Sequence, residues 1–348
     1  YTIFGGMKSV LYTSVLQTPI LLLGSLIILV LGFKELGGWD EMMRVCGAVT
    51  VNDYGDTMTN LIRSNDDANF PWLGALIGSA IIGFWYWCTD QFIVQRVLSG
   101  KNEKEARRGT IFGAYLKLLP VFLFLIPGMI AFALHQKYIG AGGEGFLPML
   151  ANGTANADAA FPTLVAKLLP AGVKGLVVCG ILAALMSSLA SLFNSSAMLF
   201  TIDFYKRFRP ETPEKKLVGI GQIATVVIVI LGILWIPIMR SVGDVLYTYL
   251  QDVQSVLAPG IAAAFLLGIC WKRTSAQGGM WGLIAGMIIG LTRLGAKVYY
   301  SNAGEVADST FKYLFYDMNW LFFCGWMFLF CIIVVIVVSL ATEAPTAE

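Results

Sequence analysis

The sequence predicts an all-α integral membrane protein, a bundle of about eight membrane-spanning helices. Hydrophobic residues make up 57% of the chain and charged residues 13%, whereas about one-quarter of an average soluble domain is charged. The mean hydropathy is +0.72. Apolar runs of about 20 residues, enough for a helix to cross a bilayer, recur along the chain. They are too long and too numerous for the alternating pattern of a β-barrel.

Eight spans are expected in chain order. They cover 6–33, 71–98, 108–135, 174–204, 215–239, 245–271, 277–299 and 318–341. Lysine and arginine gather in one set of loops, at 96–108, 206–216 and 272–273, and this set is predicted to be cytoplasmic. The opposite loops are long and poor in lysine and arginine, and the acidic segment 34–70 is expected to form an outer cap. We treat residues 1–348 as one transmembrane domain.

Several function classes find little support in the composition. The net charge is +2 and no basic stripe is present, so no nucleic-acid partner is expected. The six cysteines form no CxxC pair and are interpreted as small core residues. The one histidine, His135, lies at an expected helix end and is interpreted as a membrane-interface residue. An intramembrane enzyme would need a nucleophile with a base, or a set of metal ligands. A single histidine offers little for either arrangement, so no enzyme is expected.

The span 71–98 carries a polar and aromatic cluster, Trp85-Tyr86-Trp87-Cys88-Thr89-Asp90-Gln91. Polar groups at membrane depth normally face a protein interior or a water-filled cavity. Aromatic rings beside hydroxyl, amide and carboxylate groups suit a polyhydroxylated small molecule such as a sugar. The alternative is an interfacial aromatic belt. Three glycines before the cluster, Gly74, Gly78 and Gly83, predict that the helix is broken there.

Two further spans carry polar side chains. Lys117 lies about nine residues into its expected span, about 14 Å along a helix, which is near the midplane; the alternative is a lysine that snorkels to the surface. Gln251, Asp252 and Gln254 precede Pro259-Gly260, which predicts a second interrupted helix. The alternative for these residues is a polar outer helix end.

Small residues line one face of the span 174–204. Ala184, Ser187, Ser191 and Ser195 are spaced by three and four residues, a pattern typical of tight helix packing. The other interpretation is a site for a hard cation, because two adjacent hydroxyls, Ser187 and Ser188, and a nearby carbonyl supply the oxygen ligands that such ions prefer.

The order of these motifs resembles a known family. WYWCTDQ, IVQR and LSGKN, with PWLGALIG before them and LKLLP and AALMSSLASLFNSS after them, are similar to the sodium/glucose cotransporter branch of the solute:sodium symporters. The resemblance extends from about Tyr1 to Val338. It implies a LeuT-like fold of two inverted five-helix repeats. The first span here matches the fifth core helix, so four core helices, and the parts of both sites that they supply, are expected to lie upstream of Tyr1.

The resemblance assigns a substrate site. Tyr86 would stack on the sugar as an inner gate, with Trp87 beside it, Lys117 would donate to a sugar hydroxyl and Gln251 would hydrogen-bond the sugar. Gln254, one turn on, shares the face of Gln251. Gly83 also belongs to this site, but the family usually has a polar residue at that position.

The resemblance also assigns a sodium site to the carbonyl of Ala184 and the hydroxyls of Ser187 and Ser188. Some relatives bind a second sodium ion through an aspartate on the fifth helix and further hydroxyls on the eighth. Ser14 and Ala190 stand at two of those positions here, so one sodium ion per substrate is expected.

The expected function is therefore a sodium-coupled symporter that moves a hexose, glucose or galactose, into the cell by alternating access. The alternatives are a sodium-coupled carrier of myo-inositol or sialic acid, and a sugar-binding sensor that does not transport. The expected partners are the sugar, the co-transported sodium ion and the lipid bilayer. The expected location is the cell membrane, as a multi-pass protein, and specifically the inner membrane of a bacterium. Asn152-Gly153-Thr154 is a glycosylation sequon on the expected outer side, relevant only in a eukaryotic host.

Overall fold

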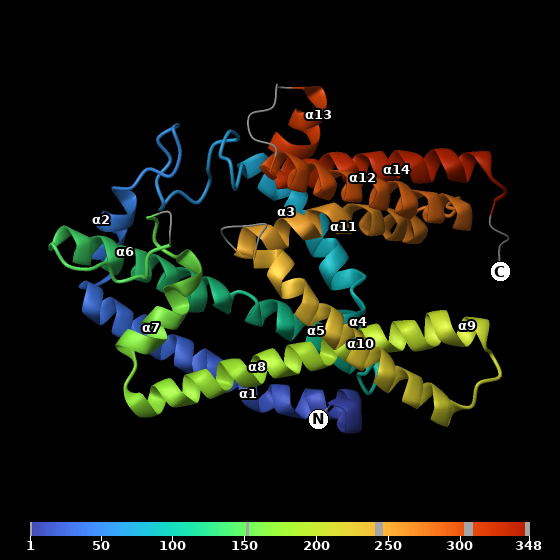
Figure 1. The fold of residues 1–348 in the computed structure, drawn as a ribbon, viewed down its shortest axis with the longest axis horizontal. Coiled ribbons are helices and arrows are strands. Elements are labelled where there is room, and N and C mark those ends of the chain that lie inside the picture. Colours follow the sequence, from blue (N-terminus) through green and yellow to red (C-terminus); the bar gives the residue numbers. More distant parts are fainter. Residues whose placement is uncertain (1, 151–152, 241–245, 303–308, 345–348) are drawn as a thin grey trace. The chain divides into compact units, whose positions relative to one another are not determined.

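The computed structural model describes residues 2–150, 153–240, 246–302 and 309–344. Within these ranges the chain is helical, apart from loops and an isolated bridge between Met149 and Ala155 (Figure 1). The helices are α1 (Thr2–Leu36), α2 (Trp39–Gly47), α3 (Trp72–Cys88), α4 (Gln91–Leu98), α5 (Glu103–Leu116), η1 (Val121–Leu125), α6 (Ile126–Gly140), η2 (Ala157–Ala159), α7 (Ala160–Leu168), α8 (Ala171–Met198), η3 (Leu199–Tyr205), α9 (Lys206–Phe208), α10 (Glu214–Arg240), α11 (Leu246–Cys270), α12 (Ala276–Asn302), α13 (Thr310–Lys312), η4 (Tyr313–Asp317) and α14 (Trp320–Ala341).

The predicted membrane spans are confirmed as helices. In the described ranges, seven helical runs are long and apolar enough to cross a membrane, and α3 with α4 makes an eighth if this bent pair is one span. The chain is therefore a multi-pass, all-α membrane protein. The bounds differ from those expected by a few residues, because helices continue past the apolar run into polar turns such as Glu103–Arg108.

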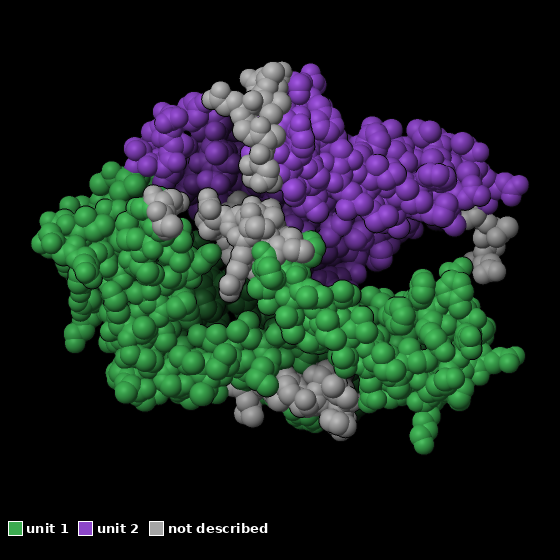
Figure 2. Space-filling view, in the orientation of Figure 1, with its two compact units in different colours: residues 1–49, 57–59, 99–241 green, residues 50–56, 60–98, 242–348 purple. Residues whose placement is uncertain are grey.

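The chain divides into two compact units (Figure 2). Unit 1 comprises residues 1–49, 57–59 and 99–241, and unit 2 comprises residues 50–56, 60–98 and 242–348. In unit 1, α1 packs along α8, and α10 packs on the same helix. Side chains such as Ile28, Ile130, Leu134 and Val177 are buried between α1, α6, α7 and α8 and form the core of this unit.

Unit 2 is a bundle of α3, α11, α12 and α14 (Figure 1). The expected interruption at Pro259-Gly260 is wrong, because α11 continues through both residues. Gly260 instead lets two helices approach: a Cβ added there would lie 3.4 Å from the Cα of Gly286 on α12. Small residues at helix crossings in membranes commonly serve this purpose.

The predicted break in the span 71–98 is real but lies elsewhere. The helix α3 runs unbroken past Gly74, Gly78 and Gly83, and the 49° bend to α4 lies within the cluster, after its three aromatic rings. Gly74 and Gly78 face α14, where an added Cβ would lie 3.1 and 2.9 Å from Leu321 atoms. These two glycines therefore serve close packing of α3 on α14 instead of unwinding α3.

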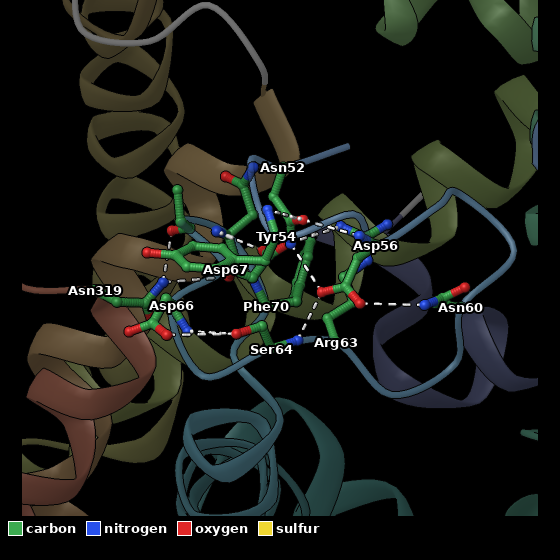
Figure 3. Close-up of polar contacts among 12 residues, drawn as sticks. Asn52, Tyr54, Asp56, Asn60, Arg63, Ser64, Asp66, Asp67, Phe70 and Asn319 are labelled. Atoms are coloured by element: carbon green, nitrogen blue, oxygen red, sulfur yellow. Dashed lines mark hydrogen bonds and ion pairs between the residues drawn. The ribbon is translucent and has the colours of Figure 1, made fainter. Parts of the chain in front are cut away.

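The expected outer segment 34–70 contains α2 and a loop held by two carboxylates (Figure 3). Asp56 accepts hydrogen bonds from the amide of Asn52 (2.8 Å) and the Ser64 N–H (2.7 Å), and the Ser64 bond is the largest cause that lowers its pKa. Asp67 is 3% exposed and accepts the N–H groups of Asn69 (2.9 Å) and Phe70 (2.7 Å). Burial, the largest single cause, raises the pKa of Asp67. The two N–H groups, the charge of Arg63 and the Asn52 amide together outweigh burial, so the pKa is lowered.

The same loop is tied to the start of α14. The Asn319 amide donates to the Ala68 carbonyl over 2.7 Å (Figure 3). Together with the carboxylates, this bond gives the loop a defined conformation within unit 2.

The interpretation of His135 as a membrane-interface residue is wrong. This side chain is buried inside unit 1, where its Nδ1 accepts the Leu147 N–H over 3.0 Å. The sequon residue Asn152 lies outside the described residues.

Candidate substrate and sodium sites

The bend between α3 and α4 uses the polar residues of the aromatic cluster. The Thr89 hydroxyl donates to the Trp85 carbonyl over 2.7 Å, and the same carbonyl accepts the Thr89 N–H over 3.0 Å at the end of α3. The Asp90 carboxylate accepts the Phe92 N–H over 3.0 Å and so caps the start of α4. Because both side chains are used in ending one helix and beginning the next, the ligand-binding potential of the cluster rests on its rings.

The rings lie just before the bend. Tyr86 is half-buried and stands edge-to-face with Trp87, the ring centroids 5.4 Å apart at 89°, and Trp85 is 6.3 Å from Tyr86 on its other side. Gly83, three residues earlier, shares the helix face of Tyr86. An added Cβ at Gly83 would meet no described atom within 4 Å.

The two predicted glutamines lie on the neighbouring helix. Within unit 2, α11 packs against α3 (Figure 1), and Gln251 and Gln254 are half-buried in the second and third turns of α11. The amides and the aromatic rings of the predicted substrate site thus belong to two packed helices of one unit.

Lys117 belongs to unit 1 and marks an irregular point in a long helical run. Helix α5 ends at Leu116, residues 117–118 form a turn, and the helix resumes at Leu119-Pro120 and continues as the π-helical segment η1. Proline lacks an N–H and so leaves the carbonyl four residues before it without its helical partner. Lys117 is exposed within unit 1, and its N–H bonds to the Gly113 carbonyl over 3.0 Å.

The serine stripe of α8 is buried where α1 packs against it. Ser187 is 4% exposed, and Ser191 and Ser195, about one and two turns after it on α8, are also buried. The Ser187 hydroxyl lies 2.8 Å from the hydroxyl of Ser14 on α1, so the two share a hydrogen bond. The Ser195 hydroxyl instead donates to the Ser191 carbonyl of its own helix over 2.8 Å.

The other two predicted sodium ligands lie on the same stretch of α8. Ala184 is half-buried, and Ser188 is exposed within unit 1. The three positions lie within about one helical turn. Ser187 therefore differs from Ser188 in that the packing of α1 already orients its hydroxyl.

Unit 2 contains a buried charge cluster that the sequence analysis did not predict. Asp252, next to Gln251 on α11, binds Lys297 on α12 over 2.5 Å and Arg293 over 3.4 Å. The signal was present, since a charged side chain within an apolar span is costly and rarely accidental. Its partners were not predictable, because Arg293 and Lys297 lie 41 and 45 residues from Asp252 along the chain and meet it only when α12 packs on α11.

Comparison with known proteins agrees with the arrangement of helices and motifs. The model of the sodium:solute symporter family matches residues 1–286. The chain belongs to this family. Its membership accounts for a helical bundle in which hydroxyl, amide and aromatic groups are kept within apolar spans.

The curated relatives of this symporter chain are named for sugars and a polyol. Sodium/myo-inositol cotransporter 2 of Homo sapiens is 36% identical over 100% of the chain and 53% of its own length. Sodium/glucose cotransporter 1 of Ovis aries is 38% identical over 100% of the chain and 55% of its own length. The sodium/mannose cotransporter of Bos taurus is 37% identical over 99% and 60%. The chain therefore spans about half the length of the curated relatives it matches.

Proposed function

We propose that this protein is a sodium-coupled symporter of a sugar or a related polyol, with a hexose as the first candidate substrate. The observation that carries the proposal is its similarity, over essentially the whole chain, to cotransporters named for glucose, mannose and myo-inositol. Both units would act as parts of one transporter domain in the cell membrane, the inner membrane in a bacterial host.

The proposed substrate groups combine an apolar platform with hydrogen-bonding side chains. Tyr86 and Trp87 would cover the apolar face of the sugar ring, and the edge-to-face contact between them supports a fixed platform. Gln251, Gln254 and Lys117 would bond its hydroxyls, and Gly83 leaves room beside Tyr86. A sugar presents both kinds of surface, which is why this set favours it over an amino acid or a purely apolar solute.

The proposed sodium ligands are the Ala184 carbonyl and the hydroxyls of Ser187 and Ser188. Sodium is a hard cation and prefers such oxygen ligands. The hydrogen bond between Ser14 and Ser187 supports this assignment, because it holds the Ser187 hydroxyl at the junction of two helices. An ion there would favour the arrangement in which its ligands are together and so couple its binding to the conformational change.

The proposed cycle follows from these positions. Sodium binds first and favours the outward-open arrangement, the sugar binds next, and a rocking of helices opens the sites to the cytoplasm. No covalent chemistry is required, so no enzymatic step is proposed.

Uptake by proteoliposomes tests the proposal. Proteoliposomes that contain the natural protein should accumulate labelled galactose only with an inward sodium gradient. Competition of this uptake by glucose, mannose, myo-inositol and sialic acid should rank these compounds as substrates. Accumulation that is equal without sodium would refute the coupling. Binding of sugar and sodium without uptake would identify a sensor instead. Competition by myo-inositol or sialic acid alone would show that this compound, and not a hexose, is the substrate.

A further inference from the structure

Arg293 is the largest fully buried side chain in the described structure, and it lies within a membrane-spanning helix. Its guanidinium donates to the Met318 carbonyl (2.9 Å) at the entry to α14 and stacks on the Phe323 ring of α14, 4.0 Å from the ring centroid. Burial of an arginine in this setting is costly, so a charged partner is required.

Asp252 is that partner. One carboxylate oxygen faces Arg293 at 3.4 Å and the other faces Lys297 at 2.5 Å. The Arg293 side chain is 0% exposed and that of Asp252 15%, so water screens their interaction weakly. One carboxylate thus ties α11 to α12, and through Arg293 to the first residues of α14.

The tie lies beside a proposed substrate group. Asp252 follows Gln251 directly, and both are in the first two turns of α11. The partners on α12 and α14 lie outside the set of helices that carries the proposed substrate and sodium residues. The charge cluster therefore connects a substrate-carrying turn to helices without a proposed binding role.

We propose that Asp252 and Arg293 are positioning residues, which hold the first turns of α11 so that the Gln251 amide faces the sugar. This inference rests on the proposed substrate role of Gln251. The rest of α11 packs through small residues such as Ala258 and Ala262 and needs no such tie. Loss of the tie should therefore weaken sugar binding and leave sodium binding, which uses residues of unit 1, unchanged.

Uptake kinetics test the positioning role. D252N and R293Q should each raise the sugar KM about tenfold, the effect expected when one hydrogen bond to the sugar is lost, with maximal uptake per molecule nearly kept. D252E, which keeps the charge, should stay within about threefold of the unchanged protein. The sugar KM of the double variant D252N/R293Q should equal that of the single variant that binds sugar more weakly, because both changes break the same tie.

D317N is the matched control. It makes the same carboxylate-to-amide change in unit 2, but its ion pair with Lys312 is long, at 4.0 Å, and Asp317 is half-exposed. Its sugar KM should be unchanged. A sugar KM of D252N within twofold of the unchanged protein, additive effects in the double variant, or an equal change in sodium affinity would each overturn the proposal.

A second measurement does not depend on transport. Gln254→Cys places a thiol one turn beyond Gln251, in a background without other reactive cysteines, and its rate of modification by a small methanethiosulfonate reports the position of this turn. D252N should change that rate about fivefold or more, whereas D317N should not. An unchanged rate would overturn the positioning role even if the protein proves not to carry sugar, and absence of sodium-coupled uptake with a changed rate would count against the proposed function alone.

Discussion

The shared hydrogen bond between Ser14 and Ser187 makes the sodium site open to a direct test. The two hydroxyl oxygens are 2.8 Å apart. Removing the Ser14 hydroxyl leaves the proposed ligand, Ser187, in place but removes the partner that orients it. Removing the Ser187 hydroxyl takes away both the partner and the ligand. The two alanine variants therefore separate orientation from ligation.

The magnitudes follow from the energies of such bonds. A hydrogen bond of this kind contributes about 0.5–1.5 kcal/mol net, which corresponds to roughly a 2- to 12-fold change in an equilibrium constant. S14A should raise the sodium concentration for half-maximal uptake by roughly that factor. S187A should raise it further, since a ligand of the ion is lost as well.

The assay is sodium-dependent uptake in proteoliposomes at saturating sugar, with S195A as the control. Ser195 lies two turns after Ser187 on α8 and is as buried as Ser187. Its hydroxyl donates to the carbonyl of Ser191 in its own helix. S195A should leave the half-saturating sodium concentration within about twofold. If S14A and S187A both behave like S195A, the hydroxyls have only a packing role and the assignment of the sodium site is wrong.

Three further outcomes are expected. The sodium dependence of uptake should have a Hill coefficient near one, because Ser14 stands where a second site would need a carboxylate; a value near two would contradict this. G78V should lower the melting temperature in detergent, because overpacking against Leu321 costs about 1–3 kcal/mol, and G268A, where an added Cβ meets no described atom within 4 Å, should not. Acid should loosen the loop around Asp67: its pKa is lowered in the folded state, so its contribution is present above the unfolded value of about 3.9 and is lost as the pH falls through the folded value. Hydrogen exchange at the Phe70 amide should stay slow from about pH 5 to 8, and fast exchange across that range would refute the role of Asp67.

The position of the helix break shows where a pattern has two physical meanings. Glycine permits an unwound turn and also permits two helices to touch, and the sequence of α3 does not distinguish these uses. Leu321 on α14 decides the matter for Gly78, because it fills the space next to that glycine. Thr89 and Asp90, which were interpreted as ligand groups, supply the cap at the actual break.

The serine stripe was predictable as a face, but its use was not. The spacing of Ser187, Ser191 and Ser195 places them on one side of any helix, and all three are buried. The hydrogen bond between Ser14 and Ser187 depends on the packing of α1 on α8, because the two serines are 173 residues apart in the chain.

By itself, the sequence determined that this chain is a bundle of membrane-spanning helices and where each span lies, because apolar runs and helix periodicity are local properties. It also determined the family through ordered motifs. Only the tertiary structure decided which glycines are packing sites, where α3 bends, and that Asp252 holds Arg293 and Lys297. Those features depend on contacts between residues distant in the chain, and the free energy of a buried charge or a close approach is set by the partner that packs against it.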